Sequence, residues 1–183
     1  FKEPALDYIV VKMPRWDLHK FRKVSKIIGS EMKSVGEVMA IGRNQQESLQ
    51  KALRGLEVGV SGFDPVIDPE DDSSVSILNN ELAEAGPDRI WYVADGFRLG
   101  MTLEEMFDVT MIDPWFLVQI QDLIKHEKQL QGTELSSIDK TSLFKLKRKG
   151  FSDKRLGDIL GCGEQAVREH RNQLDIHPVY KRV

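Results

Sequence analysis

The spacing of apolar residues changes once along the chain, from a strand-like pattern to a helical one. Residues 8–13 and 35–41 are short runs rich in β-branched residues, and Pro14 follows the first run. Both runs predict β-strands, and Pro14 is expected to stop the first one. Two strands are only marginally stable by themselves. We therefore expect them to belong to a larger sheet whose remaining strands lie outside this chain.

From Asn44 onward, apolar residues recur every three or four positions, which is typical of one face of a helix. Asn44, followed three residues later by Glu47, predicts the N-terminus of this helix. An acidic stretch over residues 59–72, interrupted by glycine and proline, predicts a linker at a domain boundary. The apolar face of the helix consists of Leu49, Ala52, Leu53 and Leu56.

The same spacing predicts two helices directly after the linker. Residues 75–85 form the first, Pro87 is suited to the first turn of the second, and Gly100 ends the second. The residues expected to point inward are Ile77, Leu78 and Leu82 in the first helix, and Ile90, Trp91, Ala94 and Phe97 in the second.

Start and stop signals mark the remaining helices. Thr102 and Glu105 form a capping box, and the dipeptide at 113–114 is an aspartate cap followed by a proline at the first helical position. The helix after this proline is predicted to be the longest. Its apolar stripe consists of Phe116, Leu117, Ile120, Leu123 and Ile124. Three more helices are expected around residues 140–149, 152–160 and 164–174, separated by Gly150 and by the glycine turn 161–163.

Composition narrows the class of protein. The chain has 183 residues, of which 40% are apolar and 30% charged, and a single cysteine, Cys162. One cysteine excludes an intramolecular disulfide and a structural zinc finger, so we expect a reducing, cytoplasmic location. No apolar run approaches the length of a membrane span. Because the chain begins at Phe1 rather than methionine, we expect it to be a piece of a longer protein.

No motif for catalysis, a metal or a cofactor stands out. The segment from Gly36 to Gly42 leads from a predicted strand into a predicted helix, but the spacing of its glycines and the residues that follow differ from a phosphate-binding loop. The acidic residues at 68–72 lack the pattern of a calcium-binding loop, so a solvated linker is expected there. The histidines share no metal-ligand spacing and are interpreted as packing or surface residues. They are His19, His126, His170 and His177.

Charge is distributed unevenly and raises one alternative function. Residues 140–183 hold 11 Lys or Arg against 5 Asp or Glu, whereas the upstream residues hold 15 against 24. Within the basic end, residues 152–174 predict two short helices around a glycine turn, similar to a helix-turn-helix that reads DNA. Glu164 and Glu169 oppose this, because they would face phosphates or bases. A DNA-binding regulator using residues 152–174 stays open as the alternative to a plain packing hairpin.

Three stretches together resemble the large chain of carbamoyl phosphate synthase, especially the bacterial type. They are residues 6–16, residues 32–43 continuing through 46–54, and a third set at 112–117, 146–153 and 177–180. The resemblance implies a ligase with two ATP-grasp halves that makes carbamoyl phosphate for arginine and pyrimidine synthesis. One half makes carbamate from bicarbonate, ATP and ammonia, and the other phosphorylates it. A small glutamine amidotransferase subunit is implied as the source of ammonia.

The resemblance also implies a domain organisation. Residues 1–56 would form the C-terminal end of the first ATP-grasp (carboxyphosphate) domain, and residues 57–183 a helical oligomerisation domain that connects the two halves. The implied fold is mainly α: short amphipathic helices preceded by a small β-containing tail. ATP, magnesium or manganese, and potassium are implied for the full-length chain and no cofactor for this segment, which is expected to be inactive alone.

Only three residues become site candidates through the resemblance. Met32, Val35 and Glu37 correspond to a segment near the route that carbamate follows between active sites. The alternative is that Met32 and Val35 are core residues and that Glu37 has a structural role. The expected partners are further copies of the same chain and the small amidotransferase subunit, with no nucleic acid and no membrane.

Overall fold

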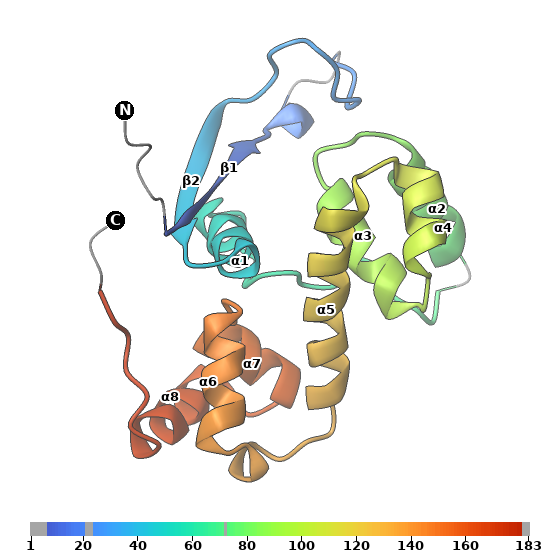
Figure 1. Ribbon diagram of the computed structural model, residues 1–183. Helices are drawn as coiled ribbons and strands as arrows, with labels where there is room; N and C mark the ends of the chain where they lie inside the picture. The colour runs from blue at the N-terminus through green and yellow to red at the C-terminus, as the bar shows by residue number, and fades with distance from the viewer. Residues whose placement is uncertain (1–6, 21–23, 72, 181–183) are drawn as a thin grey trace. The chain divides into compact units, whose positions relative to one another are not determined.

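The computed structural model describes residues 7–20, 24–71 and 73–180, which fall into two compact units (Figure 1). Unit 1 contains Phe1–Met13, Met39–Gly62 and His126–Val183, and unit 2 contains Pro14–Val38 and Phe63–Lys125. The described ranges are mostly helical with one small sheet, which confirms the predicted mainly α fold. Within these ranges, no helix has the length and apolar character needed to cross a bilayer.

The sheet consists of two antiparallel strands, β1 (Ile9–Arg15) and β2 (Gly36–Gly42). Both predicted strands are therefore confirmed, but β1 continues through Pro14, and the expected stop there is wrong. The Arg15 carbonyl accepts a 3.0 Å hydrogen bond from the Val35 N–H. The backbone groups of Arg15 thus face β2, and those of Pro14 face the other edge, where a missing N–H breaks no ladder hydrogen bond.

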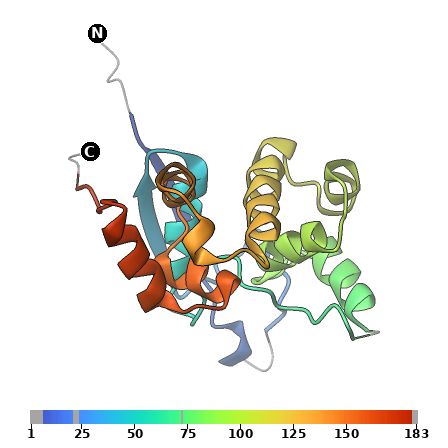
Figure 2. The ribbon, with the colours of Figure 1, turned by 90° about the horizontal axis from the view of Figure 1, so that it is seen from below.

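Unit 1 is built from α1 (Gln45–Gly55), α6 (Lys140–Arg148), α7 (Asp153–Leu160) and α8 (Glu164–Gln173) (Figure 2). It also contains the short 3₁₀ turn η2 (Leu135–Ser137), which contacts α8, and α7 and α8 pack against each other. All four residues of the predicted apolar face of α1 are buried, and the last three helices lie where the sequence predicts them. Buried apolar side chains of this unit include Leu49, Ala52, Leu53, Leu56, Leu143, Leu146, Phe151, Leu156 and Val167.

Unit 2 contains the 3₁₀ turn η1 (Leu18–Lys20), α2 (Ser74–Ala83), α3 (Arg89–Arg98) and α4 (Leu103–Thr110), with α2 in contact with α3 and α4. The longest helix, α5 (Pro114–Leu130), begins in unit 2 and ends in unit 1. Both hydrogen bonds of the predicted capping box of α4 are present. Asp113 caps α5, and its carboxylate accepts a 2.8 Å hydrogen bond from the Trp115 N–H. Buried apolar side chains here include Leu78, Leu82, Trp91, Val93, Ala94, Phe97, Met106, Leu117, Ile120, Leu123 and Ile124.

Three details of the predicted helices are wrong. Ile77 is 42% exposed, because the inward face of α2 repeats every four residues through Leu78 and Leu82, and Ile77 is rotated about 100° away from it. Phe116 is 48% exposed although it lies within about 40° of the buried Ile120 and Leu123, so its place in the first turn of α5, and not its angle around the helix, distinguishes it from them. Pro87 lies before the Asp88 cap of α3 rather than in its first turn.

The predicted linker at 59–72 has neither helix nor strand in its described residues, but part of it is anchored. Phe63 is 1% exposed, and its carbonyl accepts a hydrogen bond from the Arg98 guanidinium of α3. The Asp95 carboxylate accepts two further bonds, from the N–H groups of Val66 (2.9 Å) and Ile67 (3.1 Å). The acidic residues beyond are exposed, in agreement with a solvated segment, while Asp72 lies outside the described residues.

Candidate functional site

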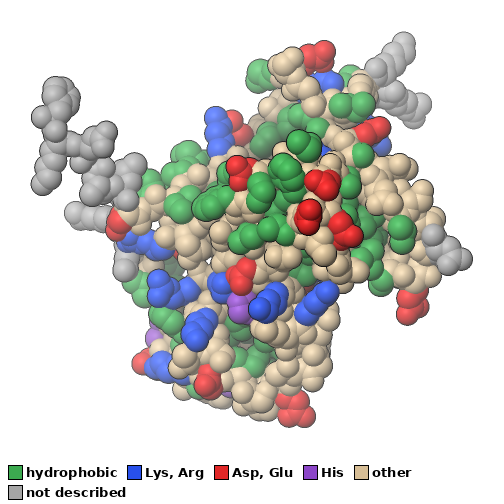
Figure 3. All heavy atoms as spheres, turned by 45° about the vertical axis from the view of Figure 1, so that its right-hand side comes forward, with side chains coloured by type: hydrophobic (Ala, Val, Ile, Leu, Met, Phe, Trp, Pro, Cys, Tyr) green, Lys and Arg blue, Asp and Glu red, His purple; other side chains and the backbone are tan. Residues whose placement is uncertain are grey.

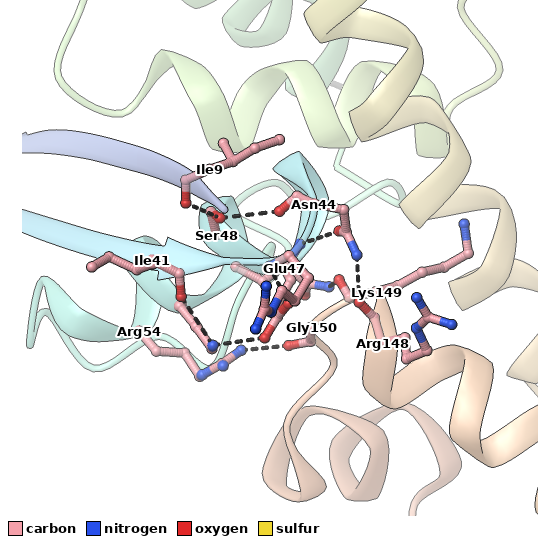
Figure 4. A network of polar contacts seen from close by, with 12 residues as sticks. Ile9, Ile41, Asn44, Glu47, Ser48, Arg54, Arg148, Lys149 and Gly150 are labelled. Carbon is pink, nitrogen blue, oxygen red and sulfur yellow. Dashed lines mark hydrogen bonds and ion pairs between the residues drawn. The ribbon is translucent and has the colours of Figure 1, made fainter. Parts of the chain in front are cut away.

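Side chains of α1 bind the C-terminal end of α6, about a hundred residues later in the chain (Figure 4). The Asn44 amide donates to the Arg148 carbonyl (2.9 Å), and the Gln50 amide donates to the Lys149 carbonyl (2.9 Å). The Arg54 guanidinium donates to the next carbonyl, that of Gly150 (2.7 Å). The last carbonyls of a helix have no partner within it, so α1 supplies these missing donors. We call this set of three bonds the carbonyl clamp.

The contact is close because residue 150 has no side chain. Gly150 has φ +93°, which favours glycine, and a Cβ there would lie 2.8 Å from the Glu47 Cα. Any larger residue would therefore push α1 away from the end of α6. The glycine predicted only as a helix separator also sets the spacing between two helices.

Neighbouring side chains of α1 are bonded to the strands (Figure 4). The Ser48 hydroxyl donates to the Ile9 carbonyl of β1 (2.9 Å), and the Lys51 ammonium donates to the Ile41 carbonyl of β2 (3.0 Å). Within unit 1, α1 thus joins both strands to the helices. The carbonyl clamp and these two bonds make one continuous polar connection.

Glu47 organises the charges at the start of α1. Asn44 caps the helix as predicted, accepting from the Glu47 N–H (2.9 Å). The Glu47 carboxylate accepts from the Arg43 N–H (2.8 Å) and from the Lys51 ammonium (2.7 Å). Burial raises the pKa of Glu47, but the bonds and charges of Lys51 and Arg43 outweigh it and hold that pKa below its ordinary value. Burial lowers the pKa of Arg54, and the Glu47 charge opposes that shift.

A second ionic group joins the last three helices of unit 1, α6, α7 and α8. Asp153 accepts from Lys147 (2.8 Å) and from Arg171 (3.1 Å), so it joins α6, α7 and α8. The Arg171 guanidinium also donates to the Ile176 carbonyl (2.6 Å). Burial raises the pKa of Asp153. The hydrogen bonds and charges of Lys147, and then of Arg171, outweigh burial and hold that pKa below its ordinary value. This group has the partners expected of a structural ion network.

The α7–α8 hairpin has the helix-turn-helix shape that the sequence predicts, but its cations are used internally. Arg155 is 6% exposed and pairs with the buried Glu127 at 2.7 Å. Arg168 pairs with Glu164 within α8. The turn is tight, because a Cβ at Gly157 would lie 2.4 Å from the Gly163 carbonyl carbon. The hairpin is therefore packed as a structural unit, and nothing in its described contacts favours a DNA-reading role.

The three site candidates from the sequence lie close together along the chain and are all exposed. Met32 is 92% exposed and Val35 is 53% exposed, both in the connection from β1 to β2, and the exposed Glu37 is the second residue of β2. Met32 and Val35 are therefore not core residues of this chain. Nothing in these positions tests a role along a carbamate route, which stays a prediction.

The other candidates form no centre among the described residues. His170 Nε2 lies 2.8 Å from the Ile138 carbonyl, and His177 lies 3.1 Å from Asp175 on the surface. Cys162 is exposed. Over residues 7–20, 24–71 and 73–180, no group of three or more His, Cys, Asp or Glu side chains is placed to hold a metal ion. The side chain of His19 lies outside the described residues.

Sequence analysis missed the carbonyl clamp. Gln50 is 1% exposed, and a buried glutamine beside an apolar helix face always needs a partner. The polar residues Gln46, Gln50 and Arg54, spaced by four on α1, were the available signal. Their partners are main-chain carbonyls, which every residue has. The spacing on α1 therefore could not show that the end of α6 is the segment that these side chains bind.

Comparisons with known proteins give the family. The family described as "Carbamoyl-phosphate synthetase large chain, oligomerisation domain" matches residues 37–175. The chain is 58% identical over 181 residues to the carbamoyl phosphate synthase large chain of Pseudomonas syringae pv. tomato, 56% to that of Pseudomonas aeruginosa and 52% to that of Vibrio cholerae. Each match covers 99% of this chain but only 17% of the relative. The chain belongs to the carbamoyl phosphate synthase large-chain family, and residues 37–175 correspond to its oligomerisation domain.

Proposed function

We propose that this chain is the helical connector and self-association domain of the large subunit of a glutamine-hydrolysing carbamoyl phosphate synthase. The observation that carries the proposal is the match of residues 37–175 to the oligomerisation domain of that large chain. The carbonyl clamp supports the connector role, because it bonds α1, which follows the strands, to helices about a hundred residues later.

The catalytic work of the whole enzyme is assigned to other parts of it. The chain spans about a sixth of the length of its relatives, at 17%. We propose that the full protein makes carbamoyl phosphate from bicarbonate, ATP and ammonia for arginine and pyrimidine synthesis in the cytoplasm. A small amidotransferase subunit would supply the ammonia from glutamine. ATP, magnesium or manganese, and potassium would bind outside these 183 residues.

Met32, Val35 and Glu37 are proposed to lie beside the route of carbamate in the full enzyme. Their exposure supports this, since residues that line a space formed with other parts of the protein would be exposed in this chain alone. In the full enzyme, Val35→Trp should then reduce carbamoyl phosphate formed per ATP hydrolysed, whereas Val75→Trp on α2, which is 60% exposed, should leave that ratio unchanged. An unchanged ratio in both variants would remove these residues from the route.

Sedimentation velocity over a concentration series tests self-association. The chain should shift from monomer to a larger species as its concentration rises to about 0.1 mM, the range in which moderate interfaces form. A strict monomer over that range would contradict the self-association proposal. The same preparation should show no ATP-dependent formation of carbamoyl phosphate, and turnover that persists through further purification would contradict the purely connecting role.

A further inference from the structure

The connection between the two strands is unusually long. β1 ends at Arg15 and β2 begins at Gly36, so about twenty residues join two antiparallel strands that a loop of about two to five residues could join. Apart from η1, the described residues of this connection contain neither helix nor strand. Loops of this length inside a compact unit are usually either disordered or functional. Hydrogen bonds hold the second half of this one in a defined conformation.

This second half, residues 24–35, is folded around the ammonium group of Lys33. The ammonium donates to the Ile27 carbonyl (2.9 Å) and to the Ser25 carbonyl (3.4 Å), and the Glu31 carboxylate lies 3.5 Å from it. Each of its three N–H groups can therefore have a partner. Figure 3 shows Lys and Arg side chains gathered at the surface, which is usual for these residues. Only 14% of the Lys33 side chain is exposed.

The apolar side chains of the same segment are largely exposed. Val24 is 41% exposed, Ile27 51%, Met32 92% and Val35 53%. A segment folded by the hydrophobic effect has the opposite arrangement, with its apolar groups inside and its lysine outside. Residues 24–35 are therefore held by a charge and its hydrogen bonds, and their apolar side chains face outward for contacts with another surface.

Two main-chain hydrogen bonds attach this segment to the rest of unit 2. The Ile28 N–H donates to the Ala85 carbonyl (2.7 Å), just after α2, and the Val35 N–H donates to the Arg15 carbonyl (3.0 Å) at the end of β1. Helix α2 lies within the range that matches the oligomerisation domain, whereas residues 24–35 precede residue 37, where that match begins. The helical part of unit 2 is thus bonded directly to the segment that precedes the domain.

We propose that Lys33 is a positioning residue and that the helical unit has a second role beside connection and self-association. It holds residues 24–35 so that Met32 and Val35 are presented to the route of carbamate. This inference rests on the proposed function, and it adds the group that fixes the conformation of the route segment. Lys33 itself is not expected to touch carbamate, because its ammonium is bonded to main-chain carbonyls.

Loss of the Lys33 ammonium should change the route without unfolding the protein. Water can take over the two carbonyls in an exposed segment, so the segment loses its single conformation while the rest of the protein stays folded. A carbamate that leaves the route takes up one water and splits at its C–N bond into bicarbonate and ammonia. The ATP used to make it then yields no product, so less carbamoyl phosphate forms per ATP hydrolysed. Partial unfolding would instead lower both amounts in proportion.

The test uses the full enzyme and substitutions at two lysines of the segment. Lys33→Met keeps the apolar stem and removes the donors, and Lys33→Arg keeps a charge with N–H groups. Lys26→Met is the matched control, because Lys26 is an exposed lysine of the same segment.

The measured quantity is the carbamoyl phosphate formed per ATP hydrolysed. Lys33→Met should lower it at least about twofold, since hydrogen bonds to a charged group can shift a conformational equilibrium about tenfold. Lys33→Arg should restore most of it, and Lys26→Met should leave it unchanged.

Hydrogen exchange gives a structural measurement on the same variants. The peptide that contains the Ile28 amide should exchange at least about tenfold faster in Lys33→Met than in the parent enzyme, with α3 unchanged. Equal exchange at Ile28 in both would show that Lys33 does not hold the segment, and it would overturn the inference.

Val35→Trp distinguishes failure of this inference from failure of the proposed route. If Val35→Trp lowers the ratio and Lys33→Met does not, the positioning role is overturned while the route proposal stands. If neither variant lowers the ratio, the route proposal and this inference both fail. A lower ratio in Lys33→Met with an unchanged ratio in Val35→Trp would mean that Lys33 acts elsewhere, which also overturns the inference.

Discussion

At the scale of single residues, Arg54 shows how one side chain fixes two distant segments. Its guanidinium donates to the Gly150 carbonyl at 2.7 Å. Arg54→Met keeps the apolar stem but leaves that carbonyl without its donor. We expect the free energy of unfolding to fall by about 2 kcal/mol, since an unsatisfied buried polar group costs that order of free energy.

Chemical denaturation measures this loss, with Arg168→Met as the matched control. Arg168 is about half exposed and bonds only within α8, to Glu164, in the described contacts. Exposed pairs of this kind contribute about 0.5 kcal/mol or less. Equal losses in the two variants would show that the carbonyl clamp adds nothing beyond an ordinary surface contact.

The acid side of the stability profile should depend on Asp153. Its pKa in the folded chain is lowered by Lys147 and Arg171 despite burial, so its contribution to stability is present above its unfolded value near 3.8. That contribution is lost as pH falls through the lower folded value. Asp153→Asn should therefore be about 2 kcal/mol less stable than the parent at pH 7.

The pH dependence of this difference in the free energy of unfolding shows whether the Asp153 charge is responsible for it. Urea denaturation of Asp153→Asn and of the parent chain at several pH values should give a difference that narrows progressively below the unfolded pKa. Asp158→Asn is the control, because Asp158 is about half exposed and pairs with Lys154 at the surface. A difference for Asp153→Asn that stays constant down to the lowest pH at which the chain folds would contradict the ionic role of Asp153.

At the scale of elements, the close approach of α7 and α8 depends on one glycine. A Cβ at Gly157 would lie 2.4 Å from the Gly163 carbonyl carbon and 2.7 Å from the Glu164 nitrogen, both in the main chain. Gly157→Ala should reduce the free energy of unfolding by about 2–3 kcal/mol, as overpacking does, although alanine favours helix in general. Thermal unfolding measures the loss.

Gly36→Ala is the control for that substitution. A Cβ at Gly36 meets nothing within 4 Å, and its φ is not in the left-handed region. Its melting temperature should stay unchanged or rise slightly, because alanine reduces the conformational freedom of the unfolded chain. If Gly157→Ala behaved in the same way, α7 and α8 would not be held at the described distance.

The helices were predictable where their signals are local. The Asn44 cap, the Thr102–Glu105 capping box and the glycine turn at 161–163 are each read within a few residues, and all are confirmed. Ile77 and Phe116 were predicted wrongly, because helical spacing shows which residues are apolar but neither the angle at which a helix meets its core nor the turn at which that contact begins. Phe63 in the supposed linker is buried, and its carbonyl is bonded by Arg98, which lies on a later helix that local signals in the linker do not reveal.

At the scale of the whole molecule, the sequence predicts the family but not the polar contacts that join its parts. The carbonyl clamp links residues 44–54 to residues 148–150 through main-chain oxygens, which every residue type possesses. No spacing rule could have matched them. The proposed boundary between residues 56 and 57 stays a prediction, while the contacts show that α1 is bonded to helices on the far side of it.

The remaining alternative, DNA binding by residues 152–174, gives the last prediction. This segment contributes Lys154, Arg155, Arg168 and Arg171, each of which pairs with an acidic side chain in the structure. Contacts with phosphates need cations that can leave their present partners, and two of these four are buried. We therefore expect fluorescence anisotropy of a labelled duplex to show no submicromolar binding.

Salt dependence and a charge variant distinguish specific DNA binding by this hairpin from weak nonspecific binding. Titrations at about 50 and 200 mM salt should give only weak binding, with dissociation constants of about 10⁻⁴ M or above at the higher salt. Glu164→Gln frees Arg168 and removes a carboxylate that would face phosphates, so it would strengthen true binding by this hairpin. Submicromolar binding by the parent chain that weakens steeply with salt and tightens in Glu164→Gln would favour the regulator. With its buried arginines held by Glu127 and Asp153, the hairpin instead has the contacts of a packing element, and we expect neither response.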